Sequence, residues 1–192
     1  MTMKLYFNPQ SRAVIAKWLL DEVGADHEIV PIDFAKGEHK TPAFRRINPA
    51  GKLPALVDGD ARIFENPAIA LYVAEKFPAA RLAPYVGTPE RGRFLSLMVY
   101  ATAQIEPSMG DQMLKLPTPP ARGWNDYAVV REVVEREIGN GPYLFGAQFT
   151  AADVMIGSMF IWQRVMGQRS GSAKIDAYID RLLARPLAMK FG

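Results

Sequence analysis

The chain has 192 residues, of which 49% are hydrophobic and 22% are charged. This composition provides enough apolar surface for a buried core and excludes a disordered chain, and the length fits one or two compact domains. The formal net charge of +3 is too small to indicate nucleic acid or a membrane surface as the main partner. Because the sequence has no cysteine, disulfides, CxxC redox motifs and a thiol nucleophile of the protein itself are excluded.

Metal sites and membrane segments also have little support in the sequence. Only His27 and His39 can supply imidazole groups, which disfavours a histidine-rich metal cluster and a Ser-His-Asp triad. The opening run MTMKLYF lacks the features of a secretory signal, and no stretch approaches the roughly 18 apolar residues of a membrane span. We therefore expect a cytoplasmic protein without a metal cofactor.

The first part of the chain predicts alternating strands and helices. Strands are expected at Lys4–Phe7 and Glu28–Ile32. Between them, apolar residues at helical spacing predict a helix over Ser11–Val23, which Gly24 ends. Because a helix separates the two strands, they should lie parallel through a right-handed crossover.

A short helix and a hairpin are predicted next. Thr41-Pro42 has the chemistry of a helix start, and Ala43–Ile47 supplies one short helical turn. Asp58-Gly59-Asp60 is a turn sequence between two strands, expected at Leu53–Val57 and Arg62–Phe64.

One further helix completes this part of the chain. Asn66 is expected as its N-cap, Pro67 as its first residue and Phe77 as its end. The predicted order of elements is therefore βαβαββα.

The remainder of the sequence predicts a helical bundle. Apolar residues at helical spacing indicate helices over 91–113, 124–138, 151–166 and 175–183. Thr150-Ala-Ala-Asp153 is a capping-box arrangement, which we interpret as structural, ahead of the bundle's buried central helix. The predicted organisation is an α/β domain over 1–77, a linker over 78–89 and an all-helical domain over 90–192.

The strongest local signal for ligand binding is the run Gly51-Lys52-Leu53-Pro54-Ala55-Leu56. A proline at a strand start has no N–H to donate and restricts the residue before it, so the backbone of Leu53 can remain unpaired. If the Leu53–Pro54 bond is cis, that backbone can hydrogen-bond an extended, peptide-like ligand as an added strand. The residues alone leave an ordinary trans bond open.

Several motifs keep the order and spacing of one known family across nearly the whole chain. They include Tyr6-Phe7-Asn8, Asn48-Pro49 followed by Gly51-Lys52-Leu53-Pro54-Ala55-Leu56, Phe64-Glu65-Asn66 and Thr150-Ala-Ala-Asp153. In these motifs the chain resembles the cytosolic glutathione S-transferases. The middle section is most similar to the phi class and its bacterial relatives, and the opening also resembles the tyrosine-type classes. The resemblance implies a thioredoxin-like N-terminal domain and an all-helical C-terminal domain.

The resemblance also implies a function. A transferase of this kind uses glutathione as co-substrate, ionises its thiol and directs it at a hydrophobic electrophile, typically in detoxification. The electrophile pocket is expected between the domains, and the protein is expected to be a homodimer. Two other functions stay open: a catalytically silent protein-binding module with this fold, and a glutathione-dependent peroxidase or reductase.

The family's glutathione contacts fall on seven residues of this sequence. Glu65 is expected to bind the γ-glutamyl ammonium, and Asn66, with the helix start, the γ-glutamyl carboxylate. The family usually has serine where Asn66 stands. Leu53 and Pro54 are expected to meet the peptide middle. The remaining three, His39, Lys40 and Lys52, match residues that bind the glycyl carboxylate, and as loop charges they could also be merely solvated.

Three residues are candidates for activating the thiol. Ser11 occupies the position of the catalytic serine of phi-like members, and Tyr6 that of the catalytic phenol of the tyrosine classes. Arg12 corresponds to an arginine that supports the thiolate in some members, although it could equally form a structural ion pair. Ser11 as a simple helix cap and Tyr6 as an ordinary strand aromatic stay open as alternatives.

Overall fold

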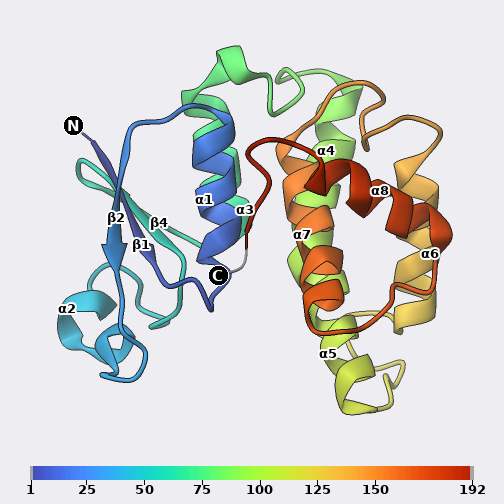
Figure 1. Cartoon of the computed structure of the whole chain (residues 1–192), viewed down its shortest axis with the longest axis horizontal. Coiled ribbons are helices and arrows are strands. Elements are labelled where there is room, and N and C mark those ends of the chain that lie inside the picture. The colour runs from blue at the N-terminus through green and yellow to red at the C-terminus, as the bar shows by residue number, and fades with distance from the viewer. Residues whose placement is uncertain (1, 191–192) are drawn as a thin grey trace. The chain divides into compact units, whose positions relative to one another are not determined.

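The computed structural model describes residues 2–190, and the chain divides into two compact units. In Figure 1 the colour follows the residue number from blue to red. The first unit contains residues 2–80 and 187–190, and the second contains residues 81–186. The domain and linker bounds expected from the sequence stay a prediction.

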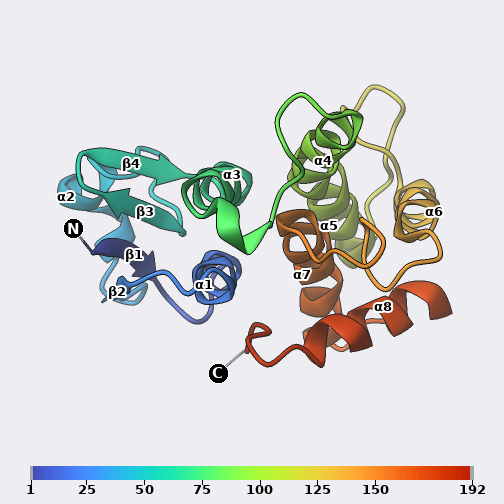
Figure 2. The same cartoon turned by 90° about the horizontal axis from the view of Figure 1, so that it is seen from above.

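The first unit is built on a mixed sheet of four strands (Figure 2). The strands are β1 (Met3–Phe7), β2 (His27–Pro31), β3 (Ala55–Asp58) and β4 (Ala61–Phe64), in the spatial order β2-β1-β3-β4. β1 pairs with β2 in parallel and with β3 in antiparallel orientation, and β3 pairs antiparallel with β4. This arrangement confirms the predicted parallel strand pair, the hairpin and the thioredoxin-like fold class.

Helices cover both faces of this sheet. They are α1 (Ala13–Glu22), a 3-10 turn η1 (Glu38–Lys40), α2 (Pro42–Arg45), α3 (Asn66–Lys76) and a 3-10 turn η2 (Pro78–Ala80). Leu5 and Leu56 are fully buried in a cluster with residues of α1 and α3. Their neighbours along the strands, Tyr6 and Ala55, lie in a second cluster with Phe44 of α2, because successive strand residues point to opposite faces. Figure 2 shows α1 and α3 on one side of the sheet and α2 on the other.

Two of the element starts that differ from the sequence prediction lie next to a proline. β3 begins at Ala55 rather than Leu53, since Pro54 cannot donate to a strand ladder. The prediction that Asn66 is an N-cap is wrong: it is the first residue of α3, and Glu65 holds the N-cap position with φ 69° and no side-chain cap bond. The Asn66 side chain bonds the carbonyl of Arg12 instead.

The second unit consists of helices. These are α4 (Pro89–Tyr100), a π-helical segment η3 (Ala101–Ile105), α5 (Glu106–Leu114), α6 (Tyr127–Ile138), α7 (Ala151–Val165) and α8 (Ala173–Leu183). The single helix expected over 91–113 is therefore α4, η3 and α5 in succession. Pro107 lacks the N–H that an uninterrupted α-helix would use at that position, which accounts for the change of winding just before it.

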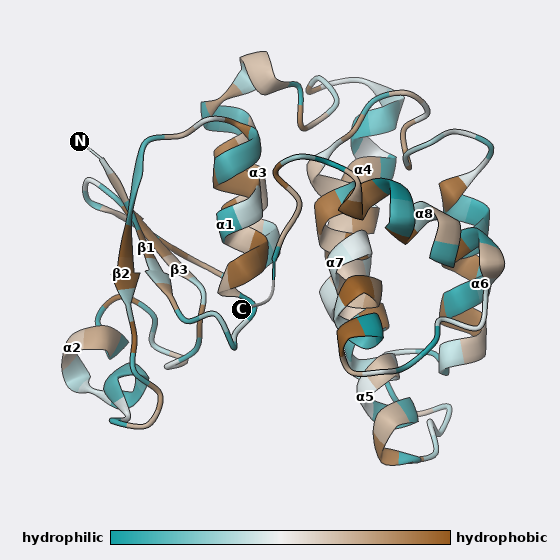
Figure 3. Ribbon diagram, in the orientation of Figure 1, coloured by the Kyte–Doolittle hydropathy of each residue, from teal (hydrophilic) through white to brown (hydrophobic). Residues whose placement is uncertain are grey.

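Helix α7 forms the core of the second unit. Nearly all of its residues are buried, which confirms the expected central helix, and Figure 3 shows apolar residues over much of it. Gly157 lets α8 approach closely, because a Cβ at this position would lie 2.1 Å from a methyl carbon of Leu182. Among residues 2–190, no helix is long and apolar enough to cross a membrane.

The expected capping box is present at the start of α7. Asp153 is fully buried, and its carboxylate accepts hydrogen bonds from the Thr150 N–H at 2.8 Å and the Thr150 hydroxyl at 3.0 Å. It also accepts from the Leu144 N–H at 2.8 Å and the Tyr178 hydroxyl at 2.9 Å. One carboxylate thus connects the segment before α7 with α8.

A second buried carboxylate fixes the segment after α5. Asp111 of α5 accepts hydrogen bonds from Thr118 at 3.1 Å, from Arg122 at 2.6 Å and from the indole N–H of Trp124 at 2.9 Å. The bonds from Trp124 and Arg122 hold the pKa of Asp111 below its ordinary value. The segment is therefore attached to α5 through a group that must stay ionised.

We expect acid to weaken this attachment. A carboxyl with a lowered pKa in the folded state stabilises the fold above its unfolded pKa, about 3.9, and this stability is lost as the pH falls through the folded pKa. The thermal unfolding midpoint of the wild type should decrease when the pH is lowered below about 4. Asp111→Asn should lower the midpoint at pH 7 and flatten its acid dependence, whereas Asp60→Asn, an exposed turn residue, should match the wild type. Equal acid sensitivity of Asp111→Asn and the wild type would contradict this role.

Candidate functional site

The loop between β1 and α1 is organised by Asn8. Its amide nitrogen donates to the carbonyl of Ile32 at 2.8 Å, and its amide oxygen accepts from the N–H of Gln10 at 2.9 Å. Its carbonyl accepts from both the N–H and the hydroxyl of Ser11, at 3.0 Å and 2.7 Å. Sequence reasoning did not predict this supporting role of Asn8, because its partner Ile32 lies 24 positions further along the chain.

Ser11 lies at the start of α1 with 8% of its surface exposed. Its hydroxyl oxygen accepts a hydrogen bond from the N–H of Ala13 at 3.1 Å while its O–H donates to Asn8. Ser11 therefore accepts from the first N–H of α1, but the N-cap position predicted as its alternative role is held by Arg12. Rotation about the Cβ–Oγ bond moves only the hydrogen, so the same oxygen can turn its O–H from Asn8 to a ligand and keep the bond from Ala13.

The other two candidates for activating the thiol, Tyr6 and Arg12, have surroundings that differ from those of Ser11. Tyr6 is half-buried, and its ring meets that of Phe44 edge-on with centroids 5.6 Å apart. Arg12 is half-buried at the N-cap position of α1, where its carbonyl accepts from Ile15 at 3.1 Å and from Asn66 at 3.2 Å. Ala13 at the start of α1 shares the apolar cluster of Tyr6.

The Leu53–Pro54 peptide bond is cis, as the sequence analysis required for a peptide-binding backbone. Leu53 lies outside the strand ladder, whose pairing with β1 begins at Ala55, and no hydrogen bond joins its backbone to another residue in the described range 2–190. The buried Asn48 supports the preceding turn, since its amide nitrogen donates to the carbonyl of Lys52 at 2.8 Å. Asn48 is a second supporting residue that the sequence analysis did not identify.

The three basic candidates lie on two neighbouring segments. His39 and Lys40 belong to η1, and Lys52 follows Gly51. Gly51 has φ +63°, and a Cβ there would lie 3.0 Å from the carbonyl oxygen of His39, so the two segments approach closely. Lys40 and Lys52 are exposed, and within the described part of the chain neither forms an ion pair.

His39 is only half-exposed. Its ring meets that of Phe34 edge-on at 4.8 Å, and its Nδ1 is buried without a hydrogen-bond partner in the described structure. A buried nitrogen without a partner is costly, so an additional group at this position would satisfy it.

Glu65 and Asn66 lie at the start of α3. Glu65 is exposed in a left-handed backbone conformation that non-glycine residues rarely adopt. Asn66 is 6% exposed, donates from its amide nitrogen to Arg12, and has an oxygen Oδ1 without a partner among residues 2–190. Through this bond the start of α3 is connected to the loop that carries Ser11.

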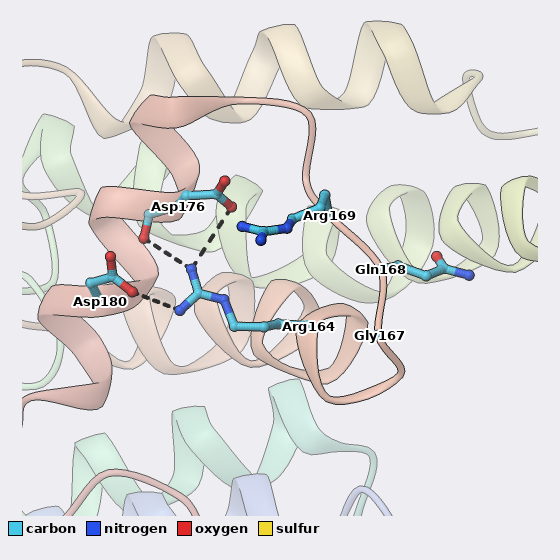
Figure 4. Close-up of a pocket in the computed structure, with 6 residues that line it drawn as sticks. All are labelled: Arg164, Gly167, Gln168, Arg169, Asp176 and Asp180. Carbon is cyan, nitrogen blue, oxygen red and sulfur yellow. Dashed lines mark hydrogen bonds and ion pairs between the residues drawn. The ribbon is translucent and has the colours of Figure 1, made fainter.

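A cavity of about 490 Å³ in the second unit contains none of these residues. It is open to solvent and is lined by Arg164, Gly167, Gln168, Arg169, Asp176 and Asp180, as Figure 4 shows. Arg164 is held by the Asp180 carboxylate at 2.6 Å and by the Asp176 carbonyl at 3.2 Å. The described residues also hold no group of three or more side chains suited to a metal ion. The candidate site is therefore the one in the first unit.

The chain is similar in sequence to known proteins. Residues 1–75 match the family model described as the N-terminal domain of glutathione S-transferase. The chain is 34% identical over 204 residues to glutathione S-transferase 3 of Zea mays, covering 98% of this chain and 92% of that protein. It is 28% identical over 207 residues to glutathione S-transferase PARB of Nicotiana tabacum, covering 99% and 97%.

Solved structures show the same likeness. A glutathione transferase of Methylococcus capsulatus is similar with a TM-score of 0.80 and 27% identity, covering 97% of this chain and 95% of that one. A sphingomonad glutathione S-transferase complexed with glutathione is similar with a TM-score of 0.75 and 28% identity, covering 96% and 94%.

Proposed function

The chain belongs to the glutathione S-transferase family and acts as a glutathione transferase, and we propose that Ser11 activates the thiol of its bound glutathione. The observation that carries this assignment is the placement of the Ser11 hydroxyl: its oxygen is fixed by Ala13, and its hydrogen can turn to a ligand. A free thiol has a pKa of about 8.5, so only a few per cent is ionised at neutral pH.

Ser11 is better placed for this task than Tyr6. A hydroxyl that donates to a thiolate contributes about 1.5–3 kcal/mol, which corresponds to a fall of about 1–2 units in the thiol pKa. The N-terminal end of α1, at which Ser11 lies, favours a negative charge further. Tyr6, in contrast, is packed against Phe44 in an apolar cluster.

Other residues of the first unit are suited to bind the remaining parts of glutathione. We propose that the backbone of Leu53, next to Pro54, pairs with the peptide middle. The exposed carboxylate of Glu65 suits the γ-glutamyl ammonium, and the start of α3 at Asn66 suits the γ-glutamyl carboxylate. His39, Lys40 and Lys52 suit the glycyl carboxylate.

The role of the lysines can be tested with a modified ligand. The double variant Lys40→Gln/Lys52→Gln should weaken glutathione binding roughly fivefold, the loss expected for exposed charge pairs. Its affinity for the glycyl monoethyl ester of glutathione, which lacks that carboxylate, should match that of the wild type in titration calorimetry. Lys36→Gln, which changes an exposed lysine paired with Asp33, is the control and should bind both ligands normally. Equal losses for both ligands would contradict the assignment.

The acceptor and the assembly are also proposals. We propose that the second substrate is a hydrophobic electrophile, as in detoxification, and that the protein is a cytoplasmic homodimer. Exposed apolar side chains of the second unit, among them Val99 at 60%, support a partner surface. Sedimentation equilibrium tests the dimer, and a single species of 21.3 kDa would refute it.

The function itself is tested by calorimetry with glutathione together with a conjugation assay on an aryl halide. Binding with turnover is expected. Binding without turnover on aryl halides or hydroperoxides would favour the silent binding module, and turnover on hydroperoxides alone would favour a peroxidase.

A further inference from the structure

The bond between Asn66 and Arg12 joins two segments that are 54 positions apart in sequence. The carbonyl of Arg12 can only accept hydrogen bonds, so the side-chain nitrogen of Asn66 must face it and the oxygen Oδ1 must face away. That oxygen is buried without a partner in residues 2–190. A buried acceptor without a partner lowers stability, so Asn66 is poorly explained as a purely stabilising residue.

The same peptide group also contacts Ser11. The carbonyl of Arg12 and the N–H of Ala13 belong to one peptide unit, whose carbonyl accepts from Asn66 at 3.2 Å and whose N–H donates to the Ser11 hydroxyl at 3.1 Å. Asn66 and Ser11 therefore bind opposite ends of one peptide dipole. A hydrogen bond to the carbonyl of a peptide polarises the group and strengthens donation by its N–H.

Resting on the proposed function, we propose that Asn66 is a positioning residue that strengthens Ser11 as a hydrogen-bond donor to the glutathione thiolate. The path is a continuous series of bonds, from the Asn66 amide to the Arg12 carbonyl, from the Ala13 N–H to the Ser11 oxygen, and from the Ser11 O–H to sulfur. The Ser11 hydrogen changes its acceptor from the Asn8 carbonyl to sulfur by rotation, while its oxygen stays bound to Ala13.

The polarity of each step favours thiol ionisation. Stronger donation to the Ser11 oxygen withdraws charge from its O–H, which becomes a better donor to an anion. The same bond fixes the 12–13 peptide plane against the start of α3, so the position of Ser11 depends on α3 as well as on α1. Asn66 thus influences the thiol without contacting it.

The test is a double-mutant cycle on the pKa of the bound thiol, measured by thiolate absorbance at saturating glutathione. Asn66→Ala should raise that pKa by roughly 0.3–0.6 unit, because cooperative strengthening is a fraction of one hydrogen bond. In the Ser11→Ala background, the same substitution should cause no further shift. Asn66→Ser gives a second reading if Asn66→Ala folds poorly, and Ile69→Val, a buried change elsewhere in α3, should leave the thiol pKa unchanged.

Each outcome bears on one proposal. An unchanged thiol pKa in Asn66→Ala and Asn66→Ser overturns the role of Asn66. A shift that persists in the Ser11→Ala background also overturns it, since Asn66 would then act on the ligand directly. If wild-type protein fails to bind or ionise glutathione, the proposed function itself fails, and this is read from the wild type alone.

Discussion

Ser11→Ala should lower kcat/KM for conjugation by about 10- to 150-fold, the factor that corresponds to a hydrogen bond of about 1.5–3 kcal/mol to an anion. The substitution removes the O–H that we assign to the thiolate and leaves the Cβ atom in place. The pKa of bound glutathione should rise by about 1–2 units in the same variant. The affinity for S-methylglutathione, which has no thiol, should change little. Stopped-flow titration of thiolate absorbance and steady-state kinetics measure these quantities.

Tyr6→Phe is the matched control for this prediction. It removes a hydroxyl from a half-buried ring that packs against Phe44 and preserves the ring itself. Its thiol pKa and kcat/KM should stay within about twofold of the wild type, as expected for a group without a role in the reaction. Loss of turnover in Tyr6→Phe with full activity in Ser11→Ala would reverse the assignment, and full activity in both variants would exclude both residues.

The features that were predicted correctly are those encoded over short distances in the sequence. The strand and helix order follows from apolar spacing, and the capping box at Thr150 and Asp153 joins residues three positions apart. The significance of Pro54 was predictable because a proline constrains its own backbone and the residue before it.

The supporting contacts of the site could not be predicted from local patterns. Asn8 binds Ile32 across 24 positions, and Asn66 binds Arg12 across 54. In the sequence, Asn66 looks like an ordinary N-cap because asparagine before proline is a common helix start. In the fold, the starts of α1 and α3 lie close together, so the Asn66 amide donates to the carbonyl of Arg12. Helix α3 therefore starts one residue earlier than predicted.

Asp153→Ala should have the largest effect on stability, with the free energy of unfolding falling by about 4 kcal/mol or more. The substitution leaves the N–H groups of Leu144 and Thr150 and the hydroxyl of Tyr178 without their buried acceptor. Each such donor costs about 1–3 kcal/mol, and the total is a large part of the 5–15 kcal/mol typical of a folded protein. Urea unfolding followed by far-UV circular dichroism measures the loss.

Two aspartate variants make this prediction specific. Asp180→Ala removes a carboxylate that is 68% exposed and pairs with Arg164, so it should cost no more than about 1 kcal/mol. Asp153→Asn has the same shape and keeps one acceptor oxygen, so it should lose about half as much stability as Asp153→Ala and give a graded reading if the alanine variant does not fold. The four bonds to Asp153 connect α7 with α8 and with the segment before α7. In the Asp153 variants, amide exchange should therefore become faster in α7, in α8 and in the segment before α7. A loss equal to that of Asp180→Ala would show that the buried carboxylate contributes no more than a surface ion pair.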